Sequence, residues 1–244
     1  MNENVDTVRI MNLDFINTTQ ENFLNNVLHK HLQNEEKCFI VTGNPEISIR
    51  AREDREYRDA VKAADYVIPD GAGILIAAKY MKQPMQERVA GYDVMRDLLA
   101  YANEQRLSCY FLGATEEVNR KAVAAAEREY PDLHIAGRHH GFFDMDDPSV
   151  VEEVRTSGAD IVLVALGLPR QELWIARHFD TFDKGVFMGV GGSIDVLAGE
   201  VKRAPDFWIR LNLEWLYRLL KQPFRFKRIL KVFEFMMRVF LKRS

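Results

Sequence analysis

Asp70 is the acidic residue whose sequence surroundings most favour contact with a bound ligand. It follows the apolar run 66–68, which is typical of a short buried strand, and Pro69 ends that run. Open α/β folds bind ligands at the carboxyl ends of their strands, which is where this arrangement places the carboxylate. Gly71 and Gly73 would let polar groups of a ligand approach backbone N–H groups at a helix start. The alternative is that Asp70 only caps the following helix.

Small or polar residues also follow four further apolar runs. They are Thr42 with Asn44, Gly113 with Thr115, Gly167 with Arg170 and Gln171, and Gly191 with Gly192, Ser193 and Asp195. In a parallel sheet these ends share one edge, so the pattern predicts a single crevice there. The run 189–193 could cradle a phosphate, but it has the spacing of neither standard nucleotide fingerprint, and glycine after a strand is commonly just a turn.

Asp144-Met145-Asp146 has the Asp-x-Asp spacing with which many metal-dependent sugar transferases hold a divalent ion on a diphosphate. Here it leads into Asp147-Pro148, where acids are favoured at a helix start without any ion. His139-His140 has no evident third ligand. We therefore expect no metal and no cofactor, and a metal-dependent transferase using Asp144 and Asp146 stays an alternative.

The elements that must position these residues alternate along the chain. We expect strands at 8–15, 37–42, 66–68, 108–112, 133–136, 161–166 and 186–190, separated mostly by helical segments. This alternation predicts an α/β fold, a Rossmann-like and mostly parallel sheet flanked by helices. Cys38 and Cys109 lie in strand-like runs and are expected to be buried free thiols of a reduced cytoplasm.

Charge is distributed unevenly along the 244 residues, whose net charge is −3. The segment 205–244 carries +7 and the segment 1–204 carries −10. We expect an α/β core over 1–204 and a basic, amphipathic helical appendage over 205–244 that meets something anionic. The first residues lack the pattern of a signal peptide, and no run approaches the length of a transmembrane helix.

A helix predicted from 224 to 243 would carry an apolar stripe. At 100° per residue an arc of about 140° holds eight of its apolar side chains. They are Phe226, Ile229, Leu230, Phe233, Met236, Met237, Phe240 and Leu241, with Lys227, Arg228, Lys231, Arg238 and Lys242 opposite. Such a helix could lie in a membrane interface, or pack on its own domain or on a second subunit. Nucleic acid is disfavoured because the core is acidic and the aromatic residues lie on the apolar face.

Eight strings, in order along nearly the whole chain, resemble one family, the WecG/TagA/CpsF bacterial glycosyltransferases. The strings are Thr42-Gly43-Asn44-Pro45-Glu46, Pro69-Asp70-Gly71, Glu87-Arg88-Val89-Ala90-Gly91-Tyr92-Asp93, Phe111-Leu112-Gly113, Gly167-Leu168-Pro169-Arg170-Gln171-Glu172, Gly189-Val190-Gly191-Gly192, Ala198-Gly199 through Lys202-Arg203-Ala204-Pro205, and Leu213-Glu214-Trp215-Leu216-Tyr217-Arg218-Leu219. Asn212 departs from the family, which often has glycine there, and this puts only a detail of a helix in doubt.

The resemblance implies an inverting, metal-independent transfer of an N-acetylhexosamine, with N-acetylmannosamine the first choice. The donor would be a UDP-sugar and the acceptor an undecaprenyl-diphosphate-linked GlcNAc on the cytoplasmic membrane face, in teichoic acid or surface polysaccharide synthesis. It also implies roles for single residues. Asp70 would be the base, Thr42 and Asn44 would line the sugars, Arg88 and Gln171 would contact the donor or its leaving group, Asp195 would lie near the nucleotide, and Arg218, Arg225 and Arg228 would close over the diphosphate.

Two other functions remain open. The chain could transfer N-acetylmannosaminuronic acid or another hexose, as relatives of the same family would. It could instead be a non-catalytic module that binds anionic lipid or a partner helix.

A nicotinamide dehydrogenase is disfavoured, because no strand is followed by Gly-x-Gly-x-x-Gly with an acid about 20 residues further on. The partners we expect are the UDP-sugar, the lipid-linked acceptor and the membrane surface, with homo-oligomers possible.

Overall fold

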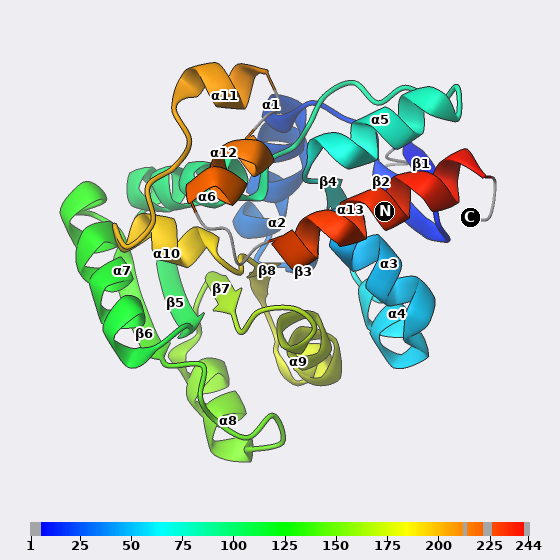
Figure 1. Cartoon of the computed structure of the whole chain (residues 1–244). Coiled ribbons are helices and arrows are strands. Elements are labelled where there is room, and N and C mark those ends of the chain that lie inside the picture. The colour runs from blue at the N-terminus through cyan, green and yellow to red at the C-terminus, as the bar shows by residue number, and fades with distance from the viewer. Residues whose placement is uncertain (1–5, 212–213, 222–225, 242–244) are drawn as a thin grey trace.

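The structure, a computed structural model, describes residues 6–211, 214–221 and 226–241. An eight-stranded sheet in the order β1-β2-β4-β3-β8-β7-β5-β6 forms its centre (Figure 1). The strands are β1 Thr7–Ile10, β2 Leu13–Ile16, β3 Lys37–Gly43, β4 Tyr66–Pro69, β5 Ser108–Gly113, β6 His134–His139, β7 Ile161–Ala165 and β8 Gly185–Gly189. All neighbouring pairs are parallel except β1 and β2. The expected α/β class with a mostly parallel sheet is confirmed.

Helices cover both faces of the sheet. One face carries α1 Gln20–Phe23, the π-helical turn η1 Leu24–Leu28, α2 His29–Gln33, α6 Gly91–Gln105, α7 Glu116–Glu129 and α10 Ser193–Leu197. The other carries α3 Pro45–Glu53, α4 Arg55–Lys62, α5 Ala72–Tyr80, α8 Pro148–Ser157, α9 Arg170–His178 and α13 Phe226–Phe240, with the 3₁₀ turn η2 Phe179–Thr181 after α9. The short helices α11 Asp206–Arg210 and α12 Glu214–Lys221 precede α13.

Side chains of the central strands alternate between the two cores. On β3, Cys38 and Ile40 pack with α1, α2, α6 and α7, whereas Phe39 and Val41 pack with α3, α4 and α9. The strand is apolar on both faces because helices cover both faces, which is why its sequence reads as a continuous apolar run. Cys38 and Cys109 are buried free thiols, as expected.

The N-terminal β segment expected at 8–15 is two strands. Met11 and Asn12 have positive φ values of 49° and 64°, and they turn the chain so that β1 and β2 pair antiparallel at the edge of the sheet. The expectation of one strand was wrong because these two residues adopt a left-handed conformation, which asparagine tolerates better than most residues. The hairpin lies beside β4 through β2.

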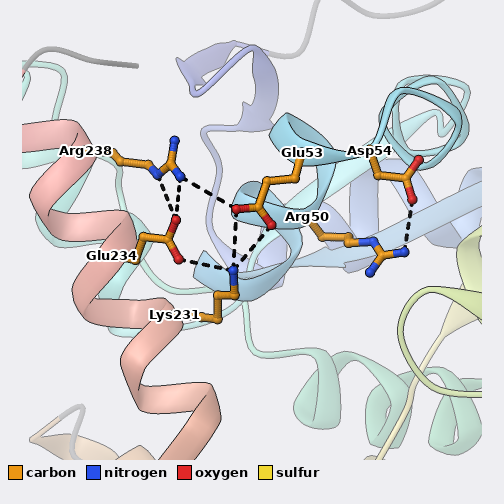
Figure 2. A network of polar contacts seen from close by, with 6 residues as sticks. All are labelled: Arg50, Glu53, Asp54, Lys231, Glu234 and Arg238. Atoms are coloured by element: carbon orange, nitrogen blue, oxygen red, sulfur yellow. Dashed lines mark hydrogen bonds and ion pairs between the residues drawn. The ribbon is translucent and has the colours of Figure 1, made fainter.

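Helix α13 lies against α3 and α5 (Figure 1). The side that packs is different from the apolar arc that we expected to meet a partner. Phe235 and Val239 are buried in the domain core. Beside them, Lys231 contacts Glu53 of α3 at 3.3 Å and Arg238 contacts the same carboxylate at 3.6 Å (Figure 2). Of the basic side, Lys231 and Arg238 therefore lie against the domain, where Glu53 pairs with both.

The apolar arc of α13 is left facing outward. Five of its members are exposed, namely Leu230, Phe233, Met237, Phe240 and Leu241. In the parts of the chain that the structure describes, none of the helices combines the length and apolar character needed to cross a membrane.

Candidate functional site

A cavity of about 510 Å³ opens along the carboxyl edge of the parallel strands. Residues from the ends of β3, β4, β7 and β8, and from the loops that follow β5 and β6, line it together. Of the residues singled out from the sequence, it is lined by Thr42, Asn44, Asp70, Thr115, Gly167, Arg170, Gln171, Gly191, Gly192, Ser193 and Asp195. The single crevice predicted from the strand ends is thus present.

Asp70 stands directly after β4, and its backbone N–H donates to the carbonyl of Gly43 at 2.8 Å. This bond holds the residue against the end of β3, so its side chain reaches the cavity with 27% of its surface exposed. Helix α5 begins after Gly71, which has a φ of 120°, and no side chain caps it. The alternative that Asp70 only caps this helix is therefore wrong.

Burial raises the pKa of the Asp70 carboxyl group above its usual value. The guanidinium of Arg88 lowers that pKa again, Glu214 raises it, and the backbone N–H of Gly91 at the start of α6 lowers it slightly. A carboxylate with a raised pKa is a better proton acceptor than an exposed aspartate. The geometry therefore gives the cavity a carboxylate suited to general-base chemistry.

Arg88 lies in the loop before α6 and contacts two carboxylates through the same nitrogen. Its Nη2 donates to Asp70 Oδ1 at 3.3 Å and to Glu214 Oε2 at 3.1 Å. Arg88 does not itself line the cavity, so it reaches the site through Asp70. Glu214 is buried at the start of α12, and we assigned it no role from the sequence. The sequence does mark Glu214 in one way: it is an acid inside one of the family strings, in a segment that is otherwise basic.

Thr42 and Asn44 come from the end of β3. Thr42 donates its hydroxyl to the Gly189 carbonyl at 3.1 Å, which ties β3 to its neighbour β8. Asn44 caps α3, because its Oδ1 accepts from the backbone N–H of Ile47 at 3.1 Å. Both residues line the cavity, as a sugar-binding role requires.

Gln171 is buried on α9 and lies against the glycine run after β8. A Cβ at Gly189 would sit 2.7 Å from its Nε2, so a side chain there would displace the amide from this position. Its Nε2 donates to Glu172 Oε1 at 2.7 Å, and Glu172 is itself fully buried at the cavity wall. Burial raises the pKa of Glu172 to about 7, which the neighbouring Tyr57 hydroxyl and Gln171 amide oppose. Glu172 is another residue to which sequence reasoning gave no role.

Gly113 does not line the cavity, whereas its neighbours Ala114 and Thr115 do. It has a φ of 124°, and a Cβ there would lie 2.4 Å from the Ala165 carbonyl oxygen. This glycine therefore serves the close packing of β5 against β7. Asp195 lines the cavity from α10, and Gly191 does so from the loop before it.

The three tail arginines cannot be placed at the site. Arg225 lies outside the described residues, and Arg218 and Arg228 belong to α12 and α13 but their side chains lie outside the described part. Their role in closing over a diphosphate stays a prediction.

An exposed aromatic ring at the cavity was also missed. Arg170 donates from its guanidinium to the carbonyls of Gly141 and Phe143 at 3.0 and 2.9 Å and so fixes the loop after β6. Phe142, between them, lines the cavity with 73% of its surface exposed. A flat apolar surface of this kind suits stacking against a planar ring or the face of a sugar.

The acidic pair Asp144 and Asp146 lies away from the cavity lining. Asp144 accepts from the backbone N–H of Asp146 at 3.0 Å, and Asp146 pairs with Arg177. Within the described residues there is no group of three or more His, Cys, Asp or Glu side chains arranged to hold a metal ion. Asp147 caps α8, as expected of an acid before a helix.

Comparison with known proteins places this site in a family. The model of the WecG/TagA/CpsF family of glycosyl transferases matches residues 8–244. The chain belongs to this family. An N-acetylglucosaminyldiphosphoundecaprenol N-acetyl-beta-D-mannosaminyltransferase of Bacillus spizizenii is 37% identical over 228 residues, which cover 93% of this chain and 88% of that protein.

Two further relatives carry the same name. The protein of Bacillus subtilis is 37% identical over 93% of this chain and 89% of its own length. The protein of Staphylococcus aureus is 37% identical over 97% of this chain and 93% of its own length. The span of the family model takes in the sheet, the segments that line the cavity and the C-terminal helices.

Proposed function

We propose that this protein transfers N-acetylmannosamine from a UDP-sugar to an undecaprenyl-diphosphate-linked N-acetylglucosamine, with inversion and without a metal. The observation that carries the proposal is Asp70, a carboxylate of raised pKa that reaches a cavity at the sheet edge beside the guanidinium of Arg88. The names of three relatives, each 37% identical, support the choice of sugar and acceptor.

The transfer needs one proton acceptor and a place for the charge of the leaving group. Asp70 takes the proton of the acceptor hydroxyl while the oxygen of that hydroxyl bonds to the anomeric carbon of the donor sugar. The bond from that carbon to the UDP oxygen breaks, and its electron pair leaves with UDP. Arg170 lines the same cavity and supplies positive charge for the phosphates without a metal ion.

Association with the inner face of the cell membrane is part of the proposal. The outward side of α13 carries the exposed Phe233, Met237 and Leu241, next to Tyr80 of α5, whose ring lies against Phe240 at 4.6 Å between centroids. An apolar helix face of this kind can lie in the interfacial region of a bilayer. Lys231 and Arg238 pair with Glu53 and Glu234 (Figure 2), so they are less able to meet anionic lipid than the sequence pattern indicated. Apolar contact therefore contributes more to membrane binding in this proposal.

The segment 205–244 would then act as the membrane-binding appendage of the core 1–204. After α11, helix α12 begins next to the site, where Glu214 meets Arg88, and α13 packs on α3 and α5. A lipid-linked acceptor that reaches the cavity from the bilayer would pass this segment. We propose the boundary near 205 on these contacts and on the charge reversal of the sequence.

The test is a transfer assay with Asp70→Asn. Wild-type protein, UDP-N-acetylmannosamine and a lipid-diphosphate-GlcNAc analogue should give a product heavier by one N-acetylhexosamine, followed by mass. The variant should lose about 10²–10⁴-fold in turnover while it still binds the UDP-sugar. Asp147→Asn is the matched control, since asparagine caps α8 as well as aspartate does.

Each alternative has its own outcome in this assay. Turnover only with another UDP-hexose, such as the uronic acid, would move the protein to a different donor within the family. Binding to anionic vesicles with no UDP release from any donor would favour the non-catalytic lipid or partner-helix module.

A further inference from the structure

Two acids share one nitrogen of Arg88, and they come from distant parts of the chain. The contact with Glu214 is 3.1 Å and the contact with Asp70 is 3.3 Å, so the acid that does not line the cavity holds the shorter bond. Glu214 is the more deeply buried of the two, with 9% of its side chain exposed against 27% for Asp70.

The charges around Asp70 are few. Among the described residues, Arg88 and Glu214 are the charged groups that act on its carboxyl group, and the backbone N–H of Gly91 is the further polar neighbour. Arg88 alone would hold Asp70 as a well-paired carboxylate, which makes a weak base. Glu214 adds a second negative charge and competes for the same nitrogen, so it raises the pKa of Asp70.

Glu214 is withdrawn from the surface and reaches a partner far away in the sequence. It lies at the first described residue of α12, is almost fully covered, and pairs with an arginine 126 positions earlier in the chain. A carboxylate withdrawn from water in this way is costly unless it is paired. Its position therefore holds Arg88 in place as much as it holds α12 against the core.

We propose that Glu214 is a positioning residue that draws Arg88 away from Asp70 and so leaves the Asp70 carboxylate free to accept a proton in the cavity. The inference rests on the proposed transferase function, because it assigns the control of the base in that reaction. Docking of α12 then sets the strength of the base, and the C-terminal segment acts on the chemistry through one ion pair.

The experiment measures the pH dependence of kcat/KM in wild type and Glu214→Gln, across the range in which both stay folded. The acidic limb should move down by about one pH unit in the variant, because loss of the second negative charge lets Arg88 pair fully with Asp70. The plateau should fall as well, since the base is weaker. Glu234→Gln is the matched control, because Glu234 is an ion-paired acid of the same C-terminal segment outside the site.

A second measurement does not depend on turnover. The carboxyl carbon signal of Asp70, assigned by its absence in Asp70→Asn, should titrate at lower pH in Glu214→Gln than in wild type. If Glu214→Gln loses its fold, Glu214→Asp keeps the charge but shortens the reach to Arg88, and it should shift the titration in the same direction by less.

An unchanged acidic limb together with an unchanged Asp70 titration would overturn the inference, even if turnover fell, because that pattern describes a purely structural contact. Failure of the proposed function shows differently. In that case wild type transfers no sugar or Asp70→Asn keeps its turnover, while the carboxyl titrations still report on Glu214.

Discussion

Gln171 donates its side-chain amide to Glu172 at 2.7 Å, and both side chains are buried at the wall of the cavity. The bond fixes the orientation of the Gln171 amide, because an ionised Glu172 can only accept and so must face the NH₂ group. A protonated Glu172 could also donate, and then the amide could turn. The protonation of a buried acid thus bears on the shape of the site.

Glu172 should make stability depend on pH. Burial raises its folded-state pKa to about 7, so the folded protein binds more protons here than the unfolded chain between about pH 5 and 7. Stability should therefore fall as pH rises through this window, by up to about 3 kcal/mol, and Glu172→Gln should lose that slope. Denaturant unfolding at several pH values checks this.

The control for that series is Glu153→Gln. Glu153 is a hydrogen-bonded acid as well, since it accepts from the Tyr110 hydroxyl at 2.6 Å, but it lies on α8 outside the cavity lining. A wild-type slope that persists in Glu172→Gln would assign the pH dependence to another group.

Gly113→Ala should destabilise the protein by roughly 3 kcal/mol, because the new methyl group meets the Ala165 carbonyl and the backbone has a φ of 124°. Gly158→Ala is the comparison: its φ is 58° and no atom lies within 4 Å of the added Cβ, so only about 1 kcal/mol is expected. Equal losses in the two variants, measured by denaturant unfolding, would show that the close approach to Ala165 carries no energy.

The two sides of α13 should respond differently to truncation. Phe235→Ala removes a fully buried ring and should cost about 3–5 kcal/mol of stability. Phe233→Ser changes an exposed ring, so stability should stay within about 0.5 kcal/mol while binding to vesicles of anionic lipid weakens. Vesicle flotation and thermal unfolding of both variants measure this. Undiminished flotation of a Phe233→Ser, Met237→Ser double variant would remove α13 from the membrane contact.

Treatment with a chelator should leave turnover unchanged. Asp144 and Asp146 are engaged by a backbone N–H and by Arg177, and they lie outside the cavity lining. The assay compares EDTA-treated protein with and without added Mg²⁺ or Mn²⁺, and with an Asp144→Asn, Asp146→Asn variant. If EDTA abolishes turnover and an added ion restores it, the protein is a metal-dependent transferase.

The crevice could be predicted because its signals are local. Each strand is a short apolar run, and the residue after it needs only the parallel arrangement to be placed at one edge. Asp70, Gln171 and Asp195 reach the same cavity for this reason, although their strands lie far apart in the sequence. The hairpin at β1 and β2 was missed because its turn, Met11-Asn12, carries no glycine or proline.

Contacts between distant segments could not be predicted in this way. The 3.6-residue period locates the apolar arc of α13, but it does not tell which side meets the domain. The side that packs combines Phe235 and Val239 with cations whose partner, Glu53, belongs to another helix. The role of Glu214 could not be predicted for the same reason, since it depends on a contact with Arg88 in a distant loop.

The pairing of Arg88 with Glu214 also sets an order of events during synthesis. The sheet and all of its strands are translated before residue 214 leaves the ribosome, so a nascent or prematurely terminated chain would carry Asp70 with Arg88 but without Glu214. Under the inference drawn above, Asp70 of such an unfinished chain is a weak base even if the core has folded. The chain would therefore be inactive until its last helices were made.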